Sequence, residues 1–179
     1  MMHTAELSII DALIEPWYSV LGRDFEGYRN HCCRVYWFCC ALSGAKGESW
    51  LKIAVAAVYH DLGIWTDGTF DYLEPSKRLV RNYLESTGKN AWTDEIVAMI
   101  EEHHKMTPWT CKPEWLVEPF RKADWIDLSL GALTFGLNRR FIFEIQGRYP
   151  NAGFHTALAR LTIERMKTHP TNPLPMMKW

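Results

Sequence analysis

The segment VYHDLG, residues 58–63, most constrains what this chain can fold into. It follows an apolar run at 53–58 and ends a predicted buried helix over residues 49–61. A carboxylate near the core is costly unless it is paired or bound to a metal. Imidazole and carboxylate together are a usual ligand set for divalent ions. The adjacent His60 and Asp61 therefore predict either a buried hydrogen-bonded pair or part of a metal site.

The rest of the chain shows apolar residues at helical spacing, with no alternating strand pattern and no internal repeat. We therefore predict an all-α fold, a single-domain bundle of about seven helices over residues 1–179. The predicted helices are 4–20 (kinked or ended at Pro16), 25–42, 49–61, 75–86, 93–105, 114–128, 137–147 and 153–168. A tail with three prolines, 169–179, is predicted to be extended, with its Met and Trp packed on the body or on a neighbouring subunit.

Composition excludes several classes of protein. A formal net charge of −1 leaves no electrostatic footprint for a nucleic acid polymer or an anionic membrane. No apolar run approaches the roughly 18 residues that a membrane span needs, and the N-terminus lacks a signal-peptide pattern. Five cysteines, an odd number, do not indicate a secreted disulfide framework. We expect a cytoplasmic protein, with a homodimer left open.

Two more polar residues stand where packing alone would not place them. His31 lies within the predicted helix 25–42, and on its own such a residue is more often an ordinary core or surface histidine, so its role depends on whether this helix packs beside His60 and Asp61. Asp124 falls on the apolar stripe formed by Phe120 and Leu128, four residues to either side. A carboxylate that faces the core needs a cation or hydrogen-bond donors there.

This ordered pattern, H…HD…D on an all-helical chain, resembles the HD-domain superfamily of metal-dependent phosphohydrolases. The segments that carry the resemblance are GYRNHCCRVY, AAVYHDLGIW, IEEHHK and RKADWID, spanning about residues 25–130, with C-terminal helices and the tail at 137–179. The resemblance implies one divalent ion per chain, such as Mn, Co, Ni, Zn, Fe or Mg, held by His31, His60, Asp61 and Asp124. It further implies hydrolysis of a small phosphate ester or nucleotide through a metal-activated water.

Several other residues are candidates for roles in that reaction. Asp61 could orient the water, and other acids or a histidine could transfer protons if the fold brings them in. The candidates for catalysis are Asp61, Asp67, Glu101 and His104. The candidates for substrate contact are Trp65, in the loop after the HD pair, and the cations Arg34, Lys77, Arg78 and Lys105. The ordinary alternative is a solvated face for the cations and a core position for the loop aromatic.

The chain departs from family members that bind two metals, which carry extra histidines before the last Asp. Here only His103 and His104 lie in that interval, at the end of the predicted helix 93–105. Only one of two adjacent helical residues is expected to face inward. A full second site is therefore not expected, although one added ligand with a bridging Asp61 stays open. The alternative functions are an HD-fold di-iron oxygenase, a zinc hydratase of small nitriles, or a non-catalytic metal- or nucleotide-binding module.

Overall fold

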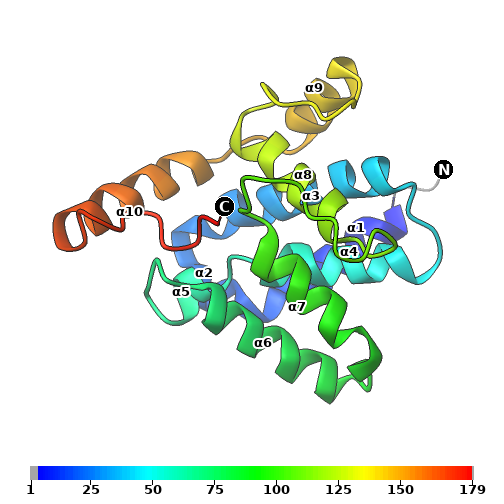
Figure 1. Ribbon diagram of the computed structural model, residues 1–179, viewed down its shortest axis with the longest axis horizontal. Coiled ribbons are helices and arrows are strands. Elements are labelled where there is room, and N and C mark those ends of the chain that lie inside the picture. The colour runs from blue at the N-terminus through cyan, green and yellow to red at the C-terminus, as the bar shows by residue number, and fades with distance from the viewer. Residues whose placement is uncertain (1–3, 179) are drawn as a thin grey trace.

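The structure, a computed structural model, describes residues 4–178 as helices joined by loops (Figure 1). No β-strand occurs among these residues, which confirms the predicted all-α fold. None of the described helices is both long and apolar enough to cross a membrane. The α-helices and short 3-10 helices (η) are α1 (Thr4–Ile14), η1 (Glu15–Trp17), α2 (Tyr18–Leu21), η2 (Gly22–Asp24), α3 (Phe25–Ser43), α4 (Glu48–Tyr59), α5 (Gly63–Thr66), α6 (Leu73–Ser86), η3 (Asn90–Trp92), α7 (Thr93–Glu102), α8 (Val117–Leu128), α9 (Arg139–Arg148) and α10 (Phe154–Thr168). Residues 1–3 and Trp179, which the predicted domain and tail include, lie outside this description.

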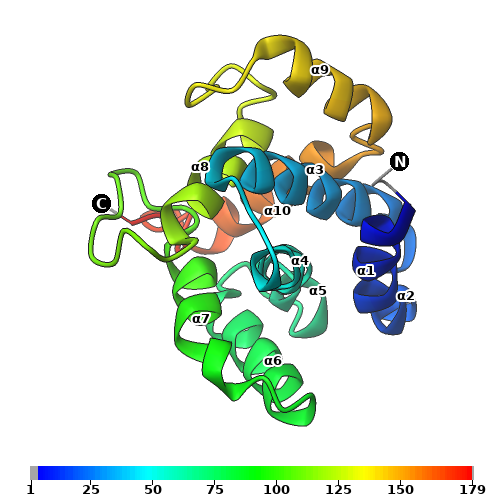
Figure 2. The same ribbon diagram turned by 90° about the vertical axis from the view of Figure 1, so that its right-hand side faces the viewer.

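Helix α4 is the centre of the bundle. Every residue from Ile53 to Val58 has no exposed surface, as expected of a helix that is apolar on all sides. Helices α1, α3, α6 and α7 pack around it, and Figure 2 shows α4 nearly end-on among them. The HD pair follows the last residue of this helix, so the fold places both side chains in the interior of the molecule.

The chain that follows residue 59 differs from the prediction, which was a helix over residues 49–61 followed by a loop. Helix α4 ends at Tyr59, and the predicted loop contains the short helix α5. Helix α5 lies directly against the start of α6, where the Gly63 N–H donates to the Ser76 hydroxyl at 3.0 Å. A Cβ atom at Gly63 would stand only 2.6 Å from the carbonyl oxygen of Tyr72. This close approach requires glycine and fixes the course of the chain after Asp61.

Two predicted helix boundaries are also wrong near the second half of the site. Helix α7 ends at Glu102 rather than at 105, so the two histidines that follow lie in a turn. Helix α8 begins at Val117 rather than at 114. Helices α3 and α8 pack side by side, which sets His31 opposite Asp124.

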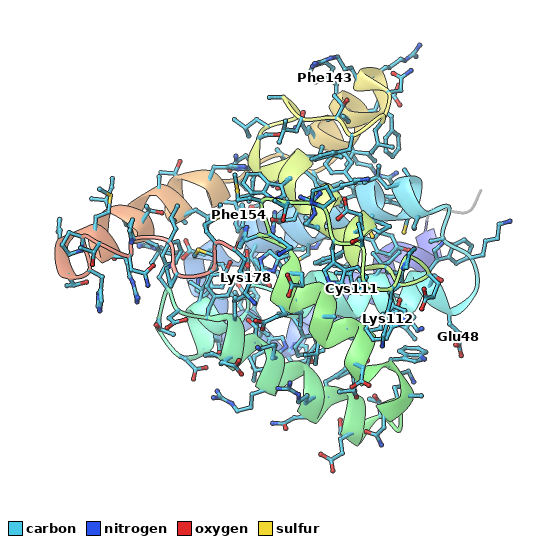
Figure 3. All side chains as sticks on the ribbon, in the orientation of Figure 1. Glu48, Cys111, Lys112, Phe143, Phe154 and Lys178 are labelled. Carbon is cyan, nitrogen blue, oxygen red and sulfur yellow. The ribbon has the colours of Figure 1, made fainter. Side chains whose placement is uncertain are left out.

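The C-terminal segment, residues 174–178, returns from the far end of α10 to the end of α7. The Met106 N–H donates to the carbonyl oxygen of Lys178 at 2.7 Å, and the Lys178 ammonium pairs with Glu101. Figure 3 labels Lys178 near the centre of the molecule. Met176 is buried in a small apolar cluster with Phe70 and Tyr72. The tail therefore packs on the body of the same chain and closes one side of the bundle beside the HD pair.

Candidate metal centre

Four buried side chains from three parts of the chain meet beyond the end of α4. The Nε2 atoms of His31 and His60 are 3.0 Å apart. The nearer carboxylate oxygen of Asp61 lies 3.4 Å from His60 Nε2, and that of Asp124 lies 3.6 Å from His31 Nε2. All four side chains are at least 96% buried. Ligand atoms that share a divalent ion are separated by roughly 3.0–3.5 Å. His31, His60 and Asp61 have ligand atoms that all lie within 4.8 Å of one another, which suits one cation, and Asp124 adjoins this set through its contacts with both imidazoles.

The orientation of the two imidazoles also favours a cation. His60 Nδ1 donates to the carbonyl oxygen of Ala57 at 2.8 Å, and His31 Nδ1 donates to Asp127 at 2.7 Å. In the neutral imidazoles both Nε2 lone pairs then point at each other, which is repulsive unless a positive charge stands between them. Burial lowers the pKa of His60, but the carboxylates of Asp61 and Asp124 outweigh burial and raise this pKa to about 9. The cluster therefore attracts a proton, which a metal ion would replace.

Three of the four carboxylate oxygens of this cluster lack a hydrogen-bond partner among the described residues. Oδ1 of Asp61 and both carboxylate oxygens of Asp124 are buried with no partner among the described residues. Burial raises the pKa of Asp124 well above its usual range. Unpaired buried carboxylates are costly, and coordination to divalent cations would satisfy these oxygens. The donor set of two imidazoles and two carboxylates therefore fits a divalent metal ion.

A second group of possible ligands adjoins the first, and His103 and His104 both belong to it. His103 Nε2 lies 3.4 Å from Asp61 Oδ1, and His104 Nδ1 lies 3.5 Å from Asp124 Oδ2. His103 Nδ1 donates to the carbonyl oxygen of Ile100 at 2.6 Å, which leaves its Nε2 lone pair facing Asp61. Asp61, His103 and His104 thus form a ligand set of their own. The prediction that only one histidine faces inward is wrong, because the turn after α7 directs both rings to the same side.

Asp127 supports His31 from behind and gives Arg34 a role that differs from the predicted one. One oxygen of Asp127 accepts from His31, and the guanidinium of Arg34 donates to both oxygens at 2.5 and 2.9 Å. Arg34 also donates to the carbonyl oxygen of Tyr149 at 2.9 Å. Burial raises the pKa of Asp127, but the hydrogen bonds from His31 and Arg34 lower it well below its usual range. Arg34, predicted to hold a phosphate, instead keeps Asp127 charged, and Asp127 fixes the tautomer of His31.

Three further predicted site residues lie apart from this cluster. Asp67, predicted to transfer protons, forms an ion pair with Arg78, predicted to bind substrate, at 2.9 Å near the surface. The indole N–H of Trp65 donates to Asp24 at 3.1 Å, and the Trp65 ring packs against Tyr28. None of these three lines the cavity beside Asp61. The structure therefore supplies no contact that would support their predicted roles.

The other three predicted residues surround the C-terminal segment. Lys77 pairs with Glu74 at 2.5 Å and with Glu101, which also pairs with Lys178. The carbonyl oxygen of Lys105 accepts from Arg121 at 3.0 Å. Lys77, Glu101 and Lys105 are likewise absent from the lining of the cavity. These contacts secure the tail and the loop after α7.

A cavity of about 250 Å³ opens on the cluster. Asp61, Tyr72 and His104 stand at its polar end, where the Tyr72 oxygen lies 2.7 Å from His104 Nε2. Sequence reasoning missed Tyr72, which precedes α6 and carries no spacing signal of its own. The remaining walls come from α8, α10, the C-terminal segment and Phe70.

Comparison with known families agrees with this geometry. The family model of the HD domain matches residues 28–137, more than half of the chain. The chain belongs to the HD domain family. HD domains bind divalent metal ions and make up a superfamily of metal-dependent phosphohydrolases. All four candidate ligands of the first group lie within the matched part of this HD domain. Neither the curated proteins nor the solved structures compared with the chain include a match.

Proposed function

We propose that this HD domain is a metal-dependent hydrolase that cleaves a small phosphate ester with a metal-activated water. The observation that carries the proposal is the buried, donor-poor ligand cluster at the end of a substrate-sized cavity. His31, His60, Asp61 and Asp124 would hold one divalent ion. When bound, such an ion lowers the pKa of a bound water and neutralises charge on phosphoryl oxygens.

Charge balance favours a second ion at Asp61, His103 and His104, in place of the one ion per chain expected from the sequence. The charges of Asp61 and Asp124 cancel a single divalent ion, whereas Asp127 is already paired with Arg34. Two divalent ions together with these two carboxylates leave a net charge of +2, which matches the dianion of a phosphate monoester. No lysine or arginine lines the cavity, so no side chain there replaces that charge.

Tyr72 is the residue best placed to assist the leaving group. Its hydroxyl lies at the polar end of the cavity, 2.7 Å from His104 Nε2 and 3.4 Å from His103 Nε2. Burial raises the pKa of Tyr72 well above its usual range, so the hydroxyl stays protonated. An N–H of His104 donated to the Tyr72 oxygen would orient the O–H toward the cavity, where it can donate to an ester oxygen.

A di-iron oxygenase is the second candidate, because the two ligand groups share Asp61 and are both rich in histidine. Iron content separates the two candidates. Two irons per chain with dioxygen-dependent turnover would favour the oxygenase. Hydrolysis of phosphate esters with Mn²⁺, Co²⁺, Ni²⁺, Mg²⁺ or Zn²⁺ would favour the phosphohydrolase.

The direct test is a phosphate-ester screen on metal-free protein reconstituted with each of these ions. His60→Ala is expected to lose the ion of the first ligand group, and Asp61→Ala, which changes the ligand shared by both groups, is expected to lose both ions. Turnover should be lost in each variant. His169→Ala, at an exposed position after α10, is the matched control and should keep both ions and turnover. Full metal occupancy in both site variants would refute the assignment, and no turnover with any ion would refute the hydrolysis.

A further inference from the structure

The cavity beside the metal cluster is apolar away from its polar end. Beyond Asp61, Tyr72 and His104, its walls are mostly aromatic and aliphatic. The polar groups of these walls are the Thr162 hydroxyl and the indole N–H of Trp125, which is buried without a partner among the described residues. Leu158, Leu174 and Met176 are apolar examples. A ribose or a nucleobase held against such walls would leave most of its own polar groups unpaired, which is costly. The walls are therefore complementary to an apolar group.

Three of the four cations predicted to bind phosphate are paired with carboxylates elsewhere. Arg34 binds Asp127, Lys77 binds Glu101, and Arg78 binds Asp67. A substrate with several phosphates, or with a second charged group, would find no partner along the cavity walls. The site can therefore balance the charge of one anionic group, at the end where the metal ligands lie.

The size of the cavity sets a further limit. Its volume of about 250 Å³ lies below the roughly 300–1,000 Å³ of pockets that hold drug-sized ligands. A single aromatic ring or a short alkyl chain fits this space better than a nucleoside does.

About half of the apolar wall comes from parts of the chain that the family match does not include. The match ends at residue 137, whereas Leu158, Leu174, Met176 and Met177 lie in α10 and the C-terminal segment. This segment is held in place by the Met106–Lys178 backbone bond and by the Lys178–Glu101 ion pair. Met176 is only 4% exposed. This part of the wall is thus held in place by contacts with the matched part of the chain.

From these observations we infer that the substrate is a compact phosphate monoester with an uncharged alkyl or aryl group, which the C-terminal segment 174–178 and α10 recognise. This inference rests on the proposed hydrolysis and names its substrate class. It excludes nucleotides, which the sequence had left open, as the preferred substrates.

Binding of non-hydrolysable phosphonates to the metal-loaded protein tests the inference without any turnover. Isothermal titration calorimetry would compare methylphosphonate, phenylphosphonate and the 5′-methylenephosphonate analogue of adenosine 5′-monophosphate, a nucleotide that cannot be hydrolysed. Phenylphosphonate is expected to bind roughly tenfold or more tightly than methylphosphonate, because its ring is buried against apolar walls. The nucleotide is expected to bind no more tightly than methylphosphonate. Equal binding of the two phosphonates, tighter binding of the nucleotide, or no binding by any probe would overturn the inference.

A matched pair of variants assigns the preference to the C-terminal wall. Met177 lines the cavity and is only partly buried, so Met177→Gln changes polarity at nearly constant length. It should reduce the preference for phenylphosphonate at least about fivefold and leave methylphosphonate binding unchanged. Met166→Gln, at a 51% exposed position on α10 outside the cavity, should change neither. An unchanged preference in Met177→Gln would overturn the role of the segment.

The two proposals fail in different ways. Turnover of esters with no preference for an apolar group would refute only the inference drawn from the cavity. A preserved preference among phosphonates, with no hydrolysis of phenyl phosphate under any metal, would refute only the proposed hydrolysis.

Discussion

Replacing Asp127 by asparagine is expected to weaken both the fold and the metal site. The carboxylate receives three hydrogen bonds, two from Arg34 at 2.5 and 2.9 Å and one from His31 at 2.7 Å. Asparagine keeps the volume but removes the charge, which leaves the guanidinium of Arg34 buried at 2% exposure without its counter-charge. Removing one partner of a buried ion pair costs about 3–5 kcal/mol. We expect about 3 kcal/mol, since the amide oxygen can still accept one bond.

The metal site should respond through His31. Loss of a partner that orients a ligating histidine typically costs 10–100-fold in metal affinity, and we expect a loss in this range for Asp127→Asn. Urea unfolding of the metal-free protein measures the first effect, and calorimetric titration with Mn²⁺ measures the second. The double variant Arg34→Met/Asp127→Asn removes both charges and should recover most of the lost stability but not the metal affinity.

Two results would refute this reasoning. A free energy of unfolding for Asp127→Asn within about 0.5 kcal/mol of the parent value would show that the Arg34–Asp127 ion pair does not hold α3 and α8 together. An unchanged Mn²⁺ affinity would show that Asp127 does not orient His31.

Three other predictions concern the cluster itself. The carboxylates raise the pKa of His60 to about 9 in the metal-free protein, so below that pH a metal ion must displace a proton. The affinity for the metal ion should therefore rise about tenfold per pH unit from pH 6 to 8 and level off above 9. A metal affinity that calorimetry finds independent of pH would contradict this prediction. His103→Ala and His104→Ala should each lower the metal content from two ions toward one, because only the second ligand group is lost. Elemental analysis measures this content, and retention of both ions would exclude these histidines as ligands. Tyr72→Phe should lower kcat about 100-fold with metal content and KM unchanged; steady-state kinetics that show only a raised KM would limit Tyr72 to binding.

The sequence predicted correctly those features that depend only on residue spacing within one helix. The apolar run of α4 predicts a buried helix before the HD pair, and the stripe of Phe120 and Leu128 predicts that Asp124 faces the core. Both features follow from local spacing, and the structure shows both.

Contacts between segments distant in sequence could not be predicted in this way. Arg34 and Asp127 are 93 residues apart, and helical spacing shows the face of each residue but not its partner. Lys178 is 77 residues from Glu101. The end of α7 at Glu102 also carries no glycine or proline signal, so the inward direction of both His103 and His104 appears only in the folded chain.

Anomalous diffraction from crystals of the Mn²⁺-reconstituted protein would locate the bound ions directly. We expect one peak among His31, His60, Asp61 and Asp124, and a neighbouring peak bounded by Asp61, His103 and His104. A protein fully loaded with metal that shows no peak at either position would contradict the metal centre and, with it, the proposed hydrolysis.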